Sequence, residues 1–218
     1  MMRPKVVLFD FDGVLADTEN VHVAAWERTF GRMGLDVPAD QCSRAAEVDD
    51  RDFLREIFHR KHVDEGDVAG WVRHKQELTV AILQDWPPLY PGVGPLLDAL
   101  QETCRMAVVT TTWRANVESV LRPCGLWDRF GWCIGKEDVS AIKPAPDAYL
   151  LALERMKIPA GNAVAVEDSP TGLEAAKAAG IRVVAVGHRR RRGEWCEGVP
   201  FVENFEDLPA VMKALGLS

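Results

Sequence analysis

The chain has 218 residues, of which 47% are hydrophobic, so it can form one large domain or a core with an insert. Its net charge of -7 disfavours nucleic-acid and membrane-surface partners, and no apolar run approaches the roughly 18 residues of a membrane span. No basic, apolar signal segment opens the sequence, and the five cysteines are scattered without a Cys-x-x-Cys pair, so we expect a protein of the reducing cytoplasm.

The first predicted element is a buried parallel strand at Val6–Phe9, which runs directly into Asp10-x-Asp12-Gly13. Parallel sheets bind ligands at the carboxyl ends of their strands, so both carboxylates lie where chemistry is expected. One could act as a nucleophile and the other as an acid and base, with a divalent metal between them. Asp and Gly are also ordinary turn residues, so a plain strand-closing turn is the competing interpretation.

Residues 18–87 show helical periodicity without a convincing strand. Apolar positions predict helices over 22–33, 53–58 and 71–82, and Gly34 is placed to end the first of them. The Pro-rich segment 86–92 then forms a connection that a helix cannot cross. The stretch is therefore predicted to be an all-helical piece.

From residue 93 onward, helices and strands alternate. Helices are expected at 93–102, 115–121, 146–156, 171–179 and 208–215, and strands at 106–109, 132–134, 163–166, 182–186 and 201–202. Such alternation implies an α/β fold with a parallel sheet and right-handed crossovers. The predicted organisation is an α/β core formed by residues 1–17 and 88–218, with the all-helical segment 18–87 inserted into it.

The later strands also end in polar residues. The strand at 106–109 runs into Thr110 and Thr111, whose hydroxyls can cap the next helix and whose amides can hold an anion. The strand at 163–166 runs into Glu167 and Asp168, a pair that is costly to bury unless a cation neutralises it. Lys143 precedes another helix start and taken alone would count as a surface lysine.

Taken together and in this order, these residues resemble the haloacid dehalogenase superfamily. Asp10 and Asp12 match its first motif, Thr110 its second and Lys143 its third, and Glu167-Asp168 match its fourth. The helical insert is similar to the family's small helical cap. The sequence segments that contain Lys143 and Glu167-Asp168 resemble those of the branch that holds beta-phosphoglucomutase and small sugar-phosphate phosphatases. The resemblance implies a Rossmann-like parallel-sheet core.

The resemblance also implies phosphoryl transfer through a covalent intermediate. Asp10 would attack phosphorus to form an aspartyl phosphate, and Asp12 would protonate the leaving alcohol and later deprotonate the attacking water. Mg²⁺ would be held by Asp10, the backbone carbonyl of Asp12, Glu167 and Asp168. The phosphate would be held by Lys143 and by Thr110 and Thr111.

Single residues favour or disfavour two other activities of the same family, those of a dehalogenase and of a mutase. A dehalogenase is disfavoured by Asp12, because displacing halide needs no protonated leaving group. A phosphosugar mutase of the beta-phosphoglucomutase type is favoured by Thr18 and His22, which stand where that enzyme has its hinge threonine and cap histidine. It is disfavoured because its cap cations have no clear match: acids stand at the arginine position unless Arg51 substitutes, and Ala81 falls near the lysine position.

A non-catalytic binding protein of the same fold is the third class, and the presence of every motif residue disfavours it. The sequence analysis therefore favours a Mg²⁺-dependent phosphatase of a small phosphorylated metabolite such as a sugar phosphate or phosphoglycolate, working as a monomer or weak dimer. Arg189–Arg192 is expected to be either a solvated basic loop or a contact to a second anionic group of the substrate. Arg114, just beyond the threonines, is a further candidate for lining the pocket.

Overall fold

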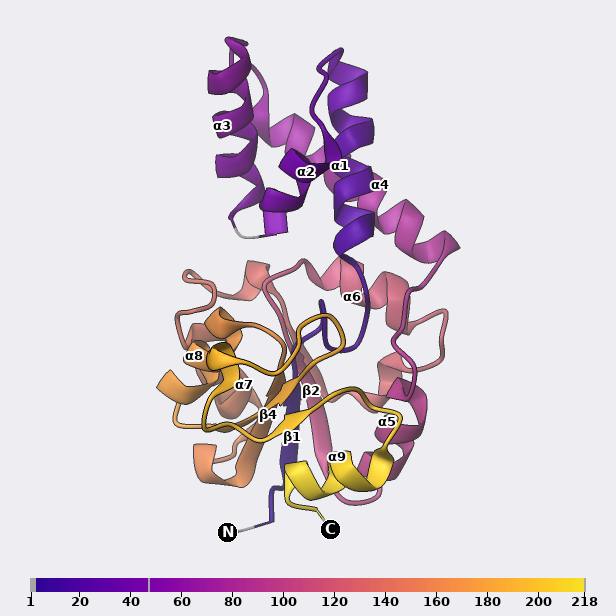
Figure 1. The fold of residues 1–218 in the computed structure, drawn as a ribbon, viewed down its shortest axis with the longest axis vertical. Coiled ribbons are helices and arrows are strands. Elements are labelled where there is room, and N and C mark those ends of the chain that lie inside the picture. Colours follow the sequence, from indigo (N-terminus) through magenta and orange to yellow (C-terminus); the bar gives the residue numbers. More distant parts are fainter. Residues whose placement is uncertain (1–2, 47, 218) are drawn as a thin grey trace. The chain divides into compact units, whose positions relative to one another are not determined.

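The computed structural model describes residues 3–46 and 48–217 (Figure 1). The chain separates into two compact units, one formed by residues 1–17 and 87–218 and the other by residues 18–86. The sequence analysis placed the second crossing one residue later, after residue 87. We call these parts the core unit and the helical unit and describe each by itself.

The core unit is built on a six-stranded parallel sheet in the order β3-β2-β1-β4-β5-β6. The strand order places β1 between β2 and β4, and all four of its residues are fully buried. Neighbours on both sides explain its uninterrupted apolar sequence. The strands are β1 (Val6–Phe9), β2 (Arg105–Val109), β3 (Trp132–Ile134), β4 (Ala163–Glu167), β5 (Arg182–Val186) and β6 (Phe201–Val202).

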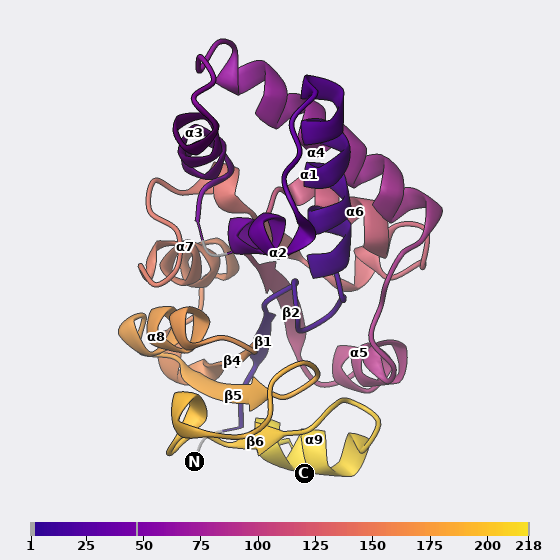
Figure 2. The ribbon, with the colours of Figure 1, turned by 45° about the horizontal axis from the view of Figure 1, so that its top comes forward.

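Helices cover both faces of this sheet. Alternate residues of β1, β2, β4 and β5 pack with the buried side of α7 (Asp147–Met156) and α8 (Pro170–Ala178) in one apolar cluster. In both ribbon views α5 (Val93–Gln101) and α9 (Leu208–Leu215) lie on the other side of the sheet (Figures 1 and 2). The remaining helix of the unit is α6 (Arg114–Leu121). The predicted α/β class with a parallel sheet is confirmed.

The helical unit has an apolar core of its own. Its helices are α1 (Glu19–Met33), α2 (Ala39–Cys42), α3 (Asp50–Lys61) and α4 (Val68–Asp85). Trp26 stacks on Phe30 at 5.2 Å between ring centroids and meets Phe53 edge-on at 5.1 Å. Gly34 ends α1 in the left-handed conformation, as predicted. The short helix α2 was not predicted, because four residues give no readable period.

Membrane insertion through a helix finds no support in the described part of the chain. None of the helices there combines the length and the apolar character that crossing a bilayer requires.

Candidate active site

Sheet register brings the side chains of Asp10 and Glu167 together. Phe9 lies beside Val166 in the ladder, and the ladder continues because the Asp10 amide donates to the Val166 carbonyl at 3.0 Å. Side chains alternate along a strand, so Asp10 falls on the face of Leu8, and Glu167 on the face of Ala165. Leu8 and Ala165 belong to the cluster under α7 and α8. Both carboxylates therefore reach the same face at the carboxyl end of the sheet.

Lys143 joins these two carboxylates. Its ammonium lies 2.8 Å from Asp10 Oδ1, 2.7 Å from Glu167 Oε1 and 2.8 Å from the Val109 carbonyl oxygen. The three N–H donors of a lysine are thereby matched by three acceptors. Burial alone would lower the pKa of Lys143, but the Asp10 and Glu167 carboxylates raise it above its ordinary value. The lysine is a fixed positive charge and not a surface residue.

Asp168 completes an acidic cluster with Asp10 and Glu167. One carboxylate oxygen from each of the three lies within 4.8 Å of the others. Burial raises the pKa of Glu167, and burial with the charge of Asp10 raises that of Asp168 to about 7. The charges of Lys143 and Arg190, which oppose the shift at Asp168, do not balance the three carboxylates.

Two glycines make room for this cluster. Gly13 has φ +79°, and a Cβ there would overlap the carboxylate of Asp168. A Cβ at Gly172, in the first turn of α8, would overlap the carboxylate of Glu167. Substituting either glycine would therefore push a carboxylate out of the cluster.

A divalent cation fits the donor set. Within residues 3–46 and 48–217, Glu167 Oε2 is buried and has no hydrogen-bond partner, which is costly for an anionic oxygen. Carboxylate oxygens at this spacing are ligands of hard cations such as Mg²⁺. A cation among the three carboxylates would satisfy both the unpartnered oxygen and the missing charge.

The threonines after β2 lie at the same end of the sheet. Thr110 is buried, its amide donates to the Ile134 carbonyl at 3.0 Å, and its Oγ1 accepts from the Thr112 amide at 3.1 Å. Thr111 is exposed. The expected helix cap is wrong, because the capping position of α6 is Trp113 and no side chain caps it there. The loop binds its own backbone instead of starting the helix.

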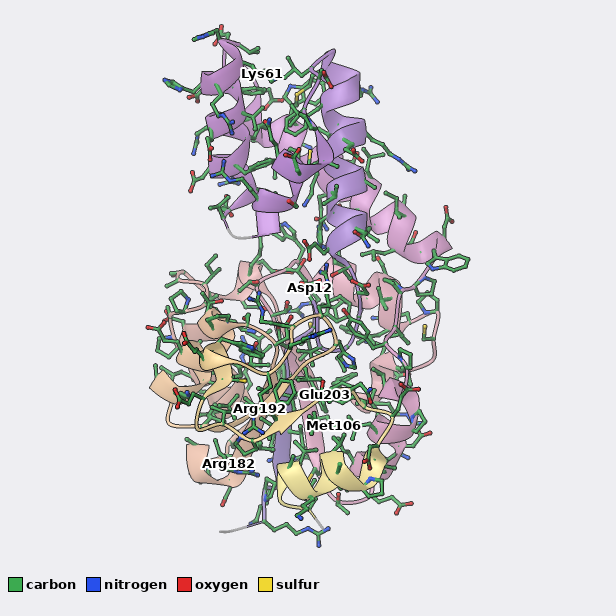
Figure 3. The ribbon with its side chains drawn as sticks, viewed as in Figure 1. Asp12, Lys61, Met106, Arg182, Arg192 and Glu203 are labelled. Atoms are coloured by element: carbon green, nitrogen blue, oxygen red, sulfur yellow. The ribbon has the colours of Figure 1, made fainter. Side chains whose placement is uncertain are left out.

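Asp12 is part of the turn that follows β1. It is half-buried and forms a bridge with Ala16 that closes this turn. Figure 3 labels Asp12 at one end of the core unit and Arg182, the first residue of β5, at the other. The direction of the parallel strands therefore puts Asp12 at the carboxyl end, with the acidic cluster.

Arg114 is engaged within the core unit. Its guanidinium binds both carboxylate oxygens of Asp138, at 2.9 and 2.8 Å, and its amide donates to Glu137 Oε1 at 3.0 Å. Both contacts with Asp138 are made by the same nitrogen, Nη2. The structure thus gives Arg114 a role in holding two loops together, and its proposed contact with substrate stays a prediction.

The helical unit places the remaining predicted residues on different elements. Thr18 is buried just before α1, His22 is half-buried in α1, and Arg51 is exposed in the first turn of α3. Ala81 is exposed on α4.

Lys75 of α4 is the cation that the sequence analysis missed in this unit. Its side chain is only 3% exposed, and its ammonium lies 3.1 Å from Asp50 Oδ1 and 3.2 Å from His22 Nδ1. It also lies 5.4 Å from the centre of the Trp26 ring. Lys75 stands six positions before Ala81, the residue expected near the lysine position of a mutase, so the helical unit does contain a buried cation on this helix.

The basic loop after β5 contacts the turn at Asp17. Arg189 Nε lies 3.6 Å from Asp17 Oδ1, and the Arg190 guanidinium lies 5.8 Å from the centre of the Trp195 ring. His188 stacks on Tyr90 with 4.0 Å between ring centroids. Most of the loop is exposed, but its first residues contact Asp17 and Tyr90 of the same unit.

Tyr149 is the residue of the core site that the sequence analysis missed. It is fully buried in α7 and donates a hydrogen bond to Glu167 Oε1. A buried phenol needs a polar partner, and that need is readable from sequence. The identity of the partner depends on how α7 lies on β4, which local sequence patterns do not contain.

Comparisons with known proteins agree with this geometry. A family model described as "Haloacid dehalogenase-like hydrolase" matches residues 7–186. Protein CbbY of Rhodobacter capsulatus is 35% identical over 211 residues, which cover 88% of this chain and 89% of that protein. The fructose-1-phosphate phosphatase YqaB of Escherichia coli is 31% identical over 184 residues, covering 83% and 95%. A mutant of CbbY from Rhodobacter sphaeroides, solved with xylulose-(1,5)bisphosphate, has a TM-score of 0.82 and 30% identity, covering 94% of this chain and 96% of that one.

Proposed function

Because the chain belongs to the haloacid dehalogenase-like hydrolase family, we propose that it is a Mg²⁺-dependent phosphatase. It hydrolyses a small sugar-phosphate monoester through an aspartyl-phosphate intermediate. The observation that carries the proposal is the Lys143 ammonium between Asp10 and Glu167, with Asp168 in the same cluster. This arrangement places a buried positive charge directly beside a carboxylate that can act as a nucleophile.

The reaction divides into two displacements at phosphorus. An Asp10 oxygen bonds to phosphorus while the bond to the sugar oxygen breaks, and Asp12 gives its proton to that oxygen. Water then attacks the aspartyl phosphate, Asp12 takes a proton from it, and inorganic phosphate leaves with Asp10 restored. A family member that displaces halide needs no such proton donor, which is why Asp12 supports the phosphatase.

Lys143 and Thr110 stabilise the charge of the transferring group. Lys143 holds Asp10 through one oxygen, Oδ1, which fixes the orientation of the nucleophile. Its charge also offsets the phosphate charge as the bond to the leaving oxygen breaks. Thr110 and the Thr111 amide offer donors at the end of the neighbouring strand.

Mg²⁺ would be held by Asp10, Glu167, Asp168 and the backbone carbonyl of Asp12. When bound, it supplies positive charge that draws the phosphate to the carboxylates and stabilises the transition state. The support for this cation is the unpartnered Glu167 Oε2 within the described cluster and the excess of carboxylates there.

The proposed substrate is a phosphorylated sugar. Two relatives support this class, since one is named for fructose 1-phosphate and the other was solved with a ketose bisphosphate. The helical unit is proposed to act as a cap that excludes water during the first displacement. We further propose that the enzyme works in the cytoplasm as a monomer or weak dimer, and that Thr18, His22, Arg51 and Arg114 are the residues to test for substrate contacts.

A phosphosugar mutase is the second candidate, and Lys75 is the observation that favours it. A mutase must hold a phosphate at both ends of its intermediate, so it needs a second cationic site. Lys75 supplies a positive charge in the helical unit, although Asp50 already neutralises it at 3.1 Å. A lysine that is already paired with a carboxylate is a weaker site for a second phosphate, so this ion pair favours the phosphatase over the mutase.

The deciding experiment measures phosphate release from a panel of monophosphates and bisphosphates of ketoses, aldoses and glycolate, with Mg²⁺ and with EDTA. We expect release from at least one sugar phosphate with Mg²⁺ and none with EDTA. Full activity in EDTA would contradict the metal assignment, and an inactive enzyme across the panel would contradict the phosphatase.

The mutase is tested in a separate reaction with beta-glucose 1-phosphate and a catalytic amount of the 1,6-bisphosphate. A phosphatase releases phosphate or leaves the sugar unchanged, whereas a mutase accumulates glucose 6-phosphate. Sustained conversion to glucose 6-phosphate that is lost in Lys75→Met or Arg51→Ala would establish the mutase instead.

A further inference from the structure

Tyr149 has a buried hydroxyl that the proposed reaction does not use. Its side chain is fully buried on the side of α7 that packs against the sheet, and the hydroxyl donates to Glu167 Oε1. Phenylalanine would fill the same apolar space without needing a polar partner. The hydroxyl therefore requires an explanation beyond packing.

The Glu167 carboxylate is held from two sides. Oε1 accepts from Tyr149 and from Lys143, and a Cβ at Gly172 of α8 would overlap the whole carboxylate, most closely at Oε2. Oε2 is also the oxygen without a hydrogen-bond partner among the described residues. Oε1 is thus engaged by donors of the protein, whereas Oε2 is the oxygen that a cation could still satisfy.

Tyr149 also limits how Lys143 is shared. The ammonium is divided among Asp10, Glu167 and the Val109 carbonyl. A Glu167 carboxylate without the Tyr149 bond would be free to turn both oxygens toward Lys143. Such a bidentate contact would draw the ammonium away from Asp10 and would remove Oε2 from the cluster.

We propose that Tyr149 is a positioning residue that fixes the Glu167 carboxylate, so that Oε1 shares Lys143 with Asp10 while Oε2 stays available to a divalent cation. This inference rests on the proposed phosphatase function. It assigns the hydroxyl an effect on cation binding and on the chemical step, and none on the binding of the sugar. Hydrogen-bond partners of metal-binding carboxylates have effects of this kind.

The test is Tyr149→Phe, which removes one oxygen and keeps the ring, including its contact with Lys143 at 5.3 Å. We expect kcat to fall about tenfold and the dissociation constant of Mg²⁺ to rise about tenfold. The latter is measured by calorimetry on the substrate-free protein. The KM of the phosphate ester at saturating Mg²⁺ should change less than about twofold, because the hydroxyl does not touch the substrate.

Ser119→Ala is the matched control. Ser119 is buried in the same unit, and its hydroxyl donates to the Ala115 carbonyl at 2.6 Å within α6. This variant also loses one buried hydroxyl hydrogen bond, and we expect its kcat and Mg²⁺ affinity to match those of the wild type. Equal losses in Ser119→Ala and Tyr149→Phe would overturn the proposal, because they would reflect general destabilisation.

A double-mutant cycle with Glu167→Gln tests whether Tyr149 acts through Glu167. In the Glu167→Gln background, Tyr149→Phe should lower Mg²⁺ affinity by less than about twofold. A tenfold loss in both backgrounds would overturn the proposal, as would wild-type kcat and Mg²⁺ affinity in Tyr149→Phe. Wild-type phosphatase activity in the same assays tests the proposed function separately.

Gly172→Ala is a second variant that can be used if Tyr149→Phe folds poorly. Its added Cβ presses on the Glu167 carboxylate, so it should show the same loss of Mg²⁺ affinity.

Discussion

Lys143 is the residue on which the geometry of the site depends. All three of its N–H donors are engaged, with Asp10, Glu167 and the Val109 carbonyl. A phosphate that enters must therefore share or displace one of these acceptors. In the proposed reaction the phosphate would share the Asp10 contact, because an acyl phosphate at Asp10 no longer carries the carboxylate charge that Lys143 offsets there.

Asp10→Asn tests the nucleophile. We expect turnover to fall at least ~1,000-fold, because a carboxamide cannot form the covalent intermediate. The melting temperature should not fall, because the change removes one charge from a crowded acidic cluster and the amide oxygen still accepts from Lys143. Phosphate release and thermal unfolding are the measurements. Turnover above a tenth of the wild-type value would exclude the covalent route.

The strands β1, β2 and β4 were predictable because each is a short apolar run that ends at a polar residue. Ala163–Glu167 shows this, since the last residue of the strand is also the first acid of the cluster. The helix α8 begins at a capping residue, Ser169, whose Oγ accepts from the Gly172 amide at 3.1 Å. By contrast, Tyr149 and Lys75 were missed. Their partners come from other elements, and only packing decides which face of a helix meets which carboxylate.

The loop after β5 carries a histidine that is kept neutral. His188 lies between the rings of Tyr90 and Phe205, with Asp17 nearby. Burial lowers the pKa of His188 from 6.5 to about 4, although the Asp17 charge opposes the shift. Burial among these rings thus keeps His188 neutral in the folded state above about pH 4.

His188 should make folding stability depend on pH. Between pH 6.5 and about 4 the unfolded chain binds a proton at His188 and the folded chain does not. Its contribution is therefore complete above pH 6.5 and is lost as the pH falls toward 4. We expect denaturant unfolding to show a larger loss of stability from pH 7 to pH 5 in the wild type than in His188→Phe, which keeps the stacked ring. Equal losses would mean that His188 titrates alike in both states.

Among the described residues, each unit contains an apolar cluster of its own. The cluster under α7 and α8 contains only residues of the core unit, and the Trp26 cluster contains only residues of the helical unit. A substitution that disrupts one of these clusters should therefore lower the stability of its own unit first. Lys75 and Asp50 offer a way to test this, since their ion pair is buried in the helical unit.

Asp50→Ala should destabilise the helical unit by about 3 kcal/mol, because it leaves the buried Lys75 charge without this carboxylate. Hydrogen exchange should show lower protection in α1, α3 and α4 and unchanged protection in β1 and β4. Asp52→Ala is the control: it removes an exposed acid of the same helical turn, paired with Arg55 at 3.1 Å, and should have little effect. Equal effects of the two substitutions, or a loss of protection in β1, would contradict two independent cores.

The two chain crossings between the units are tied together on the core side. Ala16 and Leu89 form an antiparallel bridge, the Asp17 amide donates to the Pro88 carbonyl at 2.8 Å, and the Tyr90 amide donates to the Leu15 carbonyl at 3.0 Å. The core unit thereby closes its own chain before the helical segment begins and after it returns. Residues 18–86 therefore behave as a loop whose two ends are already held together by contacts of the core unit. The entropy lost on closing a loop grows only slowly with its length. Insertions of very different size can therefore occupy this position without disturbing the sheet.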